Sequence, residues 1–127
     1  MIQTMIDFPN VFSQKQLEYI GQNVVEAAKQ TCGDRLRDVI LYGSYARGDF
    51  REWSDVDIMV LADADGVRCN QYGNDLLEFL FDLNYHMNLL LSIMVTPYQQ
   101  FERFKKDYAF YRNVNTEGAR LCLKTSA

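Results

Sequence analysis

The sequence contains few of the residues that build a zinc site, a disulfide framework or a membrane span. Its 127 residues include three cysteines and one histidine, too scattered for the Cys-x-x-Cys or Cys–His clusters of zinc sites. The odd number and wide spacing of the cysteines also argue against a disulfide framework and predict a cytoplasmic protein. The apolar runs are far too short to span a bilayer, and the N-terminus shows no secretory-signal pattern.

Positive charge is also scarce. Asp and Glu (17) outnumber Lys and Arg (13), so the formal net charge is −4. A general nucleic-acid binder needs a basic face, so direct binding to nucleic acid is not expected. A nucleotide bound through a metal ion is still compatible with this charge, because the cation supplies the positive charge. The hydrophobic content of 48% is typical of a globular protein, and the length fits a single domain.

The hydrophobic pattern predicts an α/β domain, with a small sheet flanked by helices. A helix should begin at Ser13, whose side chain can form a capping box with Gln16, and end at Gly33. A second capped start is expected at Thr96, directly before Pro97. Strands are expected over 39–42, 55–62 and 87–95. We divide the chain into an N-terminal arm (1–12), a catalytic core (36–96) and a C-terminal helical segment (97–127).

A further helix is expected over about 67–83, between the second and third strands. Its predicted buried stripe consists of Leu76, Leu77, Phe79, Leu80 and Leu83.

Two carboxylates open the second expected strand. Asp55 and Asp57 are two residues apart, so both side chains leave the same face of the strand. Like charges this close are costly unless a cation lies between them. Mg²⁺ commonly binds one or two protein carboxylates together with phosphate oxygens and water. An Asp-x-Asp pair is common, however, and by itself it more often marks a solvated strand start or an N-cap pair.

A glycine-containing turn follows the first expected strand. Gly43 allows the backbone to approach a phosphate closely, and Ser44 can donate both its N–H and its hydroxyl at a helix start. Arg47, one turn later, is placed to reach a phosphate, and Gly48 allows a second tight bend. The alternative is a plain strand-to-helix turn followed by a surface arginine.

The two features together carry more information than either alone. A Gly-Ser turn after an apolar strand, then ten residues, then Asp-x-Asp opening another apolar strand, resembles the DNA-polymerase-β-like nucleotidyltransferases. The string G-S-Y-A-R-G-D-F-R-E-W-S-D-V-D-I-M-V is similar to the minimal nucleotidyltransferases (MNT proteins). This resemblance implies a nucleotidyltransferase fold, with Gly43 and Ser44 on the nucleotide phosphates and Asp55 and Asp57 as ligands of one or two Mg²⁺ ions.

The family pattern includes a third carboxylate on the next strand, and the expected third strand contains no Asp or Glu. Asn88 is the polar residue nearest the expected position, and Ser92 is the alternative. Neither side chain is a charged ligand or a general base.

The resemblance also implies a substrate and a partner. MNT proteins commonly pair with a HEPN-domain toxin and act as its antitoxin, either by transferring AMP from ATP to a tyrosine of the toxin or by binding it. We therefore expect Mg²⁺-dependent transfer of a nucleoside monophosphate to a protein hydroxyl. The alternatives are a weak or inactive antitoxin that acts by binding, and a small-molecule transferase of the antibiotic-modifying kind, which the short chain disfavours.

Overall fold

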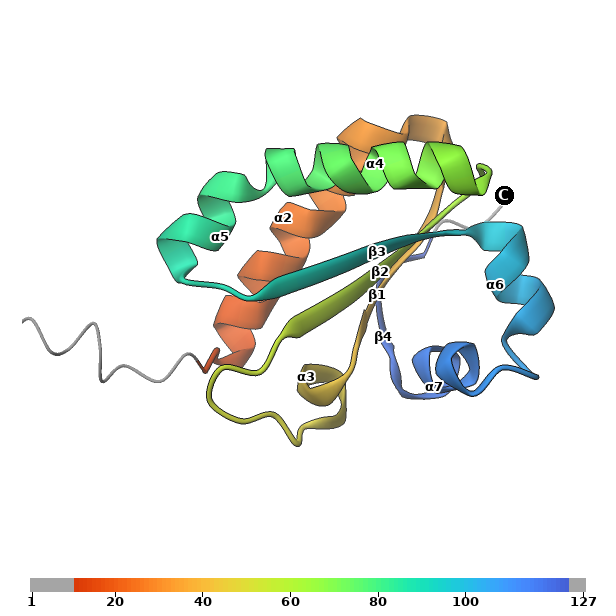
Figure 1. Cartoon of the computed structure of the whole chain (residues 1–127). Coiled ribbons are helices and arrows are strands. Elements are labelled where there is room, and N and C mark those ends of the chain that lie inside the picture. The colour runs from red at the N-terminus through yellow and green to blue at the C-terminus, as the bar shows by residue number, and fades with distance from the viewer. Residues whose placement is uncertain (1–10, 124–127) are drawn as a thin grey trace, which may run out of the picture.

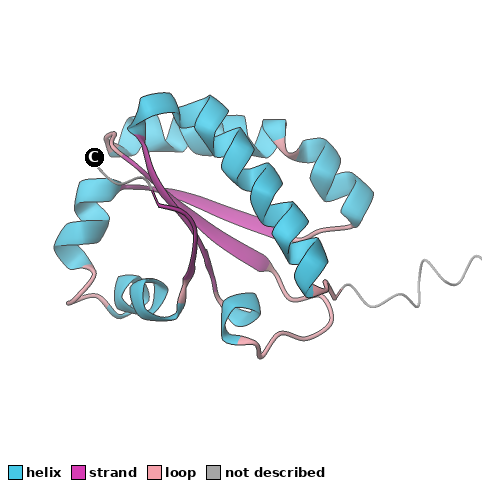
Figure 2. Ribbon diagram, turned by 180° about the vertical axis from the view of Figure 1, so that it is seen from behind, coloured by secondary structure: helices cyan, strands magenta, loops and turns pink. Residues whose placement is uncertain are grey.

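The chain folds into a four-stranded mixed sheet with helices on both faces (Figures 1 and 2). The computed structural model describes residues 11–123, so residues 1–10 of the predicted arm lie outside the described part. β1 pairs antiparallel with both β2 and β4, whereas β2 and β3 are parallel. The α/β class predicted from the sequence is confirmed. The strands, in sheet order, are β3 (Leu91–Pro97), β2 (Val56–Ala62), β1 (Leu36–Tyr42) and β4 (Ala119–Leu123).

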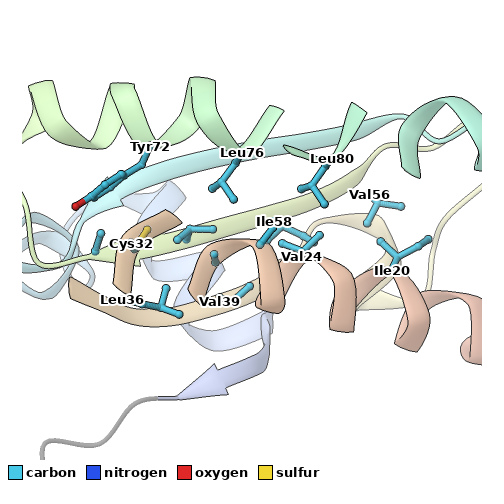
Figure 3. Packing of buried hydrophobic residues seen from close by; sticks show 14 of the residues in the cluster. Ile20, Val24, Cys32, Leu36, Val39, Val56, Ile58, Tyr72, Leu76 and Leu80 are labelled. Atoms are coloured by element: carbon cyan, nitrogen blue, oxygen red, sulfur yellow. The ribbon is translucent and has the colours of Figure 1, made fainter. Parts of the chain in front are cut away.

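Two long helices cover one face of the sheet. They are α2 (Gln14–Cys32), followed by the short 3-10 helix η1 (Gly33–Arg35), and α4 (Gly66–Phe79). The predicted capping box is present, because Ser13 accepts from the Gln16 N–H and Gln16 accepts from the Ser13 N–H. Gly33 ends α2 at φ 58°, as predicted. The core between these helices and the sheet is shown in Figure 3 and includes Ile20, Val24, Val39, Val56, Ile58, Tyr72 and Leu76.

The predicted helix over 67–83 consists of two helices, because the chain changes direction at Leu80 between α4 and α5 (Phe81–Met87). The predicted stripe is partly wrong. Leu76 and Leu80 are buried, but Leu77 and Phe79 are 48% and 54% exposed. Neighbouring residues such as Leu76 and Leu77 point in different directions on a helix, so both cannot face one narrow core. The other buried positions of α4 are Cys69 and Tyr72.

The second face of the sheet carries a smaller core. Phe101 of α6 (Tyr98–Phe104) and Val114 of α7 (Ala109–Glu117) pack on Ile40, Met59 and Leu61. Residues alternate between the two faces of β2, as predicted, since Val56, Ile58, Val60 and Ala62 belong to the first core. The alternation places Asp57 on the second face, which α3 (Ser44–Arg47), α6 and α7 approach (Figure 1).

The start of α6 differs from the prediction. Pro97, rather than Thr96, is the N-cap residue, and no side chain caps this helix. Thr96 is buried within β3 and pairs with Leu61, so the strand continues past the predicted helix start.

The predicted helical segment from residue 97 onward also contains a strand, β4, which pairs with β1. Arg120 of β4 donates to Asp38 of β1 and to Asn115. Asp38 is only 1% exposed, and burial raises the pKa of its carboxyl while the Arg120 guanidinium acts in the opposite direction. This ion pair ties the last strand of the described chain to the strand that leads into the Gly-Ser turn.

Candidate active site

The Gly-Ser turn joins β1 to the short helix α3. Gly43 is the N-cap residue of α3, with φ 76° and ψ −156°, a conformation that is essentially restricted to glycine. Its carbonyl accepts from the N–H groups of Ala46 and Arg47 at 3.1 and 3.0 Å. Gly48 ends the helix at φ 89°, and its N–H donates to the Ser44 carbonyl. The sequence prediction of a tight turn at each of these two glycines is thus confirmed.

The carboxylate pair lies directly against this turn. Asp55 comes immediately before β2, and Asp57 pairs with Tyr42, the last residue of β1, across the antiparallel ladder. The Asp57 carboxylate fills the space beside the Gly43 Cα. A Cβ built on Gly43 would overlap Asp57 Oδ2 and lie 3.2 Å from its Cγ. A glycine is therefore required here by the carboxylate as well as by the backbone conformation.

The electrostatics of the pair favour a bound cation. Burial raises the pKa of Asp57 above its ordinary value, and the nearby Asp55 carboxylate raises it further, whereas Arg47 acts in the opposite direction. Burial and the Asp57 charge likewise raise the pKa of Tyr42. A metal ion between the two carboxylates would relieve their repulsion.

The two carboxylates and the turn line one cavity of about 410 Å³. The five residues that the sequence predicted for phosphate and metal binding, Gly43, Ser44, Arg47, Asp55 and Asp57, lie in its wall, whereas Asn88 and Ser92 do not. Mg²⁺ fits this donor set, because it needs only one or two protein carboxylates when phosphate and water oxygens complete its coordination shell. Among the described residues, no three Asp, Glu, His or Cys side chains are grouped closely enough to hold a metal by themselves.

Arg47 lies at the cavity but already has acidic partners. Its Nε is 3.3 Å from Asp49 Oδ2, and its Nη1 is 3.6 Å from Glu117 Oε1. Asp49 is the main cause of the raised Arg47 pKa. These are exposed ion pairs, which contribute little to stability, so a phosphate can compete for the guanidinium at small cost.

The structure corrects the position expected for a third carboxylate. The predicted strand 87–95 begins at Leu91, because α5 continues to Met87 and Asn88 closes it in a left-handed conformation at φ 51°. Asn88 is therefore not on the strand. Ser92, the alternative, pairs with Asp57 in the parallel β2–β3 ladder and lies on the same face. The position next to Asp57 thus carries a hydroxyl instead of a carboxylate.

Helix α7 supplies a wall of the cavity that the sequence analysis missed. Phe110, Asn113, Val114 and Glu117 line it, at the i, i+3, i+4, i+7 spacing of one helix face. The ring of Phe110 packs edge-on against Tyr42 at 5.7 Å. Phe110 and Tyr42 therefore form an aromatic part of the cavity wall, in contrast to the carboxylates of Asp55 and Asp57. The helical spacing was present in the sequence, but nothing there showed which part of the fold this face would meet.

Comparison with known proteins agrees with the fold and the site. A model of the nucleotidyltransferase domain matches residues 22–121. This match covers most of the chain and includes the turn and both carboxylates. The chain therefore belongs to the nucleotidyltransferase domain family.

Two relatives come from Methanocaldococcus jannaschii. "Putative protein adenylyltransferase MJ0604" is 32% identical over 97 residues, which are 74% of this chain and 86% of that protein. "Putative protein adenylyltransferase MJ1305" is 47% identical over 85 residues, or 66% of this chain, and the match spans only 58% of that protein.

A solved structure of a mutant MntA-HpeT toxin-antitoxin shares the fold, with a TM-score of 0.50 and 16% identity. The similarity covers 83% of this chain and 74% of that one. In the part of the chain that the structure describes, no helix is long and apolar enough to cross a membrane.

Proposed function

We propose that this protein is a Mg²⁺-dependent adenylyltransferase that transfers AMP from ATP to a hydroxyl of a partner protein. The observation that carries the proposal is the contact between the Gly43 turn and the Asp57 carboxylate in one open cavity. This contact supports the proposal, because nucleotidyl transfer requires a phosphate-binding group beside metal-binding groups. The names of the two archaeal relatives support protein as the acceptor.

In this proposal each part of the cavity has one task. Gly43 and Ser44 bind the phosphates, Arg47 leaves Asp49 for a phosphate oxygen, and Asp55 and Asp57 hold the metal. A bound Mg²⁺ supplies positive charge to the triphosphate and the pyrophosphate leaving group. The aromatic side formed by Tyr42 and Phe110 is suited to pack against the base.

We further propose that the partner is a HEPN-domain toxin and that the two proteins meet in the cytoplasm. The likeness in sequence to MNT proteins supports this pairing, and the fold is shared with an MntA-HpeT toxin-antitoxin structure. A HEPN reading frame beside the gene would identify the cognate partner for the experiments below.

The test is incubation of the chain with Mg-ATP and the cognate HEPN protein, followed by intact-mass analysis of both proteins. We expect a gain of one or more AMP units on the partner, lost in the D55N/D57N double variant. The variant D63N is the matched control, because Asp63 is an exposed carboxylate beside Arg37, away from the cavity. Absence of any AMP gain while the two proteins bind one another would refute transfer to this partner.

A second function is favoured by one observation: β3 presents Ser92 where a third carboxylate would stand. An antitoxin that neutralises its partner by contact alone needs no such group. The D55N/D57N variant separates the two, since neutralisation that survives it unchanged does not depend on chemistry.

A further inference from the structure

A second hollow, of about 450 Å³, lies on the other side of Asp55. We call it the α5 groove. Its wall includes Asp55, Phe81, Asn84, Tyr85, Leu90 and Ser92. Phe81, Tyr85 and Leu90 are 65%, 74% and 44% exposed, so large apolar surfaces face solvent here. Exposed apolar surface gathered in one hollow is typical of a binding site.

The α5 groove is placed where an acceptor must enter. Asp55 lines both this groove and the cavity of the Gly-Ser turn, so a phosphorus held at Asp55 is within reach of both. The Val56 N–H donates to the Leu90 carbonyl at 2.8 Å, which fixes the floor of the groove to the start of β2. In phosphoryl transfer the attacking and leaving oxygens lie roughly in line. With pyrophosphate on the Gly43–Ser44 side, the attack comes from the α5 side.

The residues that line the α5 groove favour an acceptor without a charge. Among residues 11–123, Asp55 is the only charged residue lining the groove, and no lysine or arginine lines it. A nucleic-acid or other phosphorylated acceptor would lack a positive partner here, and an aminoglycoside would meet only one carboxylate. The rings of Phe81 and Tyr85 are stacked, with centroids 6.5 Å apart and planes 13° apart. Such a surface suits an aromatic or aliphatic side chain with a terminal hydroxyl.

Two observations favour a polypeptide over a small molecule. β3 is an edge strand of the described sheet, so backbone groups along its outer edge have no strand partner there. Asn84 lines the groove, and its buried Oδ1 has no hydrogen-bond partner among the residues that the structure describes. An unpaired buried amide oxygen is costly, and a turn of the amide would offer it to a peptide N–H.

We propose that the α5 groove is the docking site for the acceptor segment of a partner polypeptide, which places its hydroxyl next to Asp55. This inference rests on the proposed function. The acceptor hydroxyl oxygen forms a bond to the α-phosphorus of ATP, and the bond from this phosphorus to the α,β-bridging oxygen breaks. Pyrophosphate leaves with that electron pair, and the hydroxyl proton passes to water at the open mouth of the groove. Phe81, Tyr85 and Asn84 are positioning residues in this step.

The test uses N-acetyl-tyrosine amide as the acceptor probe and N-acetyl-phenylalanine amide as a probe without the hydroxyl. Mg-ATP binding to wild-type protein is measured first, by calorimetry. Adenylylation of the tyrosine probe is then followed by mass spectrometry for wild type, Phe81→Ala, Tyr85→Ala and Phe79→Ala. Phe79 is the matched control, because it is equally aromatic and 54% exposed but lies outside the groove.

We expect Phe81→Ala and Tyr85→Ala each to raise the KM for the probe about tenfold, as loss of an aromatic anchor does, with Mg-ATP affinity unchanged. Phe79→Ala should behave as wild type. Amide shifts in an NMR titration with either probe, in the presence of Mg²⁺ and a non-hydrolysable ATP analogue, should centre on Tyr85, Leu90 and Ser92.

Failure of wild-type protein to bind Mg-ATP would refute the proposed function itself. If Mg-ATP binds and the partner protein gains AMP, three results overturn the α5 groove alone: no labelling of the tyrosine probe, equal KM values for the groove variants and the Phe79 control, or NMR shifts elsewhere on the surface. Circular dichroism of each variant verifies that it is folded.

Discussion

Replacing Gly43 by alanine tests the core of the site with one methyl group. The new Cβ overlaps the Asp57 carboxylate, and Gly43 has φ 76° and ψ −156°, which alanine avoids. The backbone strain costs about 1–3 kcal/mol. The remaining conflict is relieved only if the Asp57 carboxylate moves away from the turn, since its Cγ and Cβ lie 3.2 and 3.4 Å from the added atom. The displacement separates the carboxylate proposed to bind metal from the turn proposed to bind phosphate.

Gly48→Ala is the matched control. Gly48 also has a positive φ, at 89°, but a Cβ there meets no atom of the described residues within 4 Å. It therefore carries backbone strain of about 1 kcal/mol without touching Asp57. We expect both variants to lower the free energy of unfolding in urea, and only Gly43→Ala to weaken Mg-ATP binding, by about tenfold or more, equivalent to ~1.4 kcal/mol. Wild-type affinity for Mg-ATP in folded Gly43→Ala would refute the argument that this contact organises the site.

Two further predictions concern the framework around the site. Tyr45→Phe removes the hydroxyl that accepts from the buried Phe12 N–H at 3.2 Å, so we expect the free energy of unfolding in urea to fall by about 1–3 kcal/mol. An effect no larger than that of the exposed control Tyr19→Phe would contradict this. Arg120→Ala leaves the buried Asp38 carboxylate without its cation and should cost about 2–4 kcal/mol near neutral pH. Burial already raises the Asp38 pKa, and the variant lacks the Arg120 guanidinium that lowers it. The protonated form of Asp38 is therefore more favourable in the variant. The loss in free energy of unfolding should therefore shrink as the pH falls through the folded-state pKa of Asp38, because the neutral carboxyl needs no cation. A loss that is independent of pH would show that the ion pair is not its origin.

The sequence predicted the structure best where a conformation depends on neighbouring residues alone. The capping box at Ser13, the glycines at 33, 43 and 48, and the alternation along β2 depend on neighbouring residues only, and the structure has all of them. The cavity residues followed from the same local rules. Because β1 and β2 are antiparallel neighbours, Gly43, which follows the last residue of β1, and Asp57, near the start of β2, lie at the same end of the sheet.

The sequence was least informative where tertiary contacts decide. β4 was missed because five residues with alternating apolar side chains become a strand only by pairing with β1. The start of β3 was misplaced because Leu89 and Leu90 are apolar and equally compatible with a strand. Their place in the loop after α5 depends on Asn88, whose left-handed conformation ends that helix. The face of α7 at the cavity likewise depends on how the helix packs.

The charges around the cavity indicate the order in which its parts act. Asp55, Asp57 and Glu117 line it, while Arg47, the only arginine or lysine among the described residues of its wall, is already paired with acidic side chains. A nucleotide without its metal would therefore be repelled, so metal and triphosphate are expected to arrive together. Ser92, next to Asp57, adds a hydroxyl that can donate to a phosphate oxygen but cannot take a proton as a carboxylate would. Under the proposed function, such a site would bind Mg-ATP with two carboxylates and would leave deprotonation of the acceptor to solvent. Strong binding combined with slow transfer is the behaviour that this combination of residues predicts.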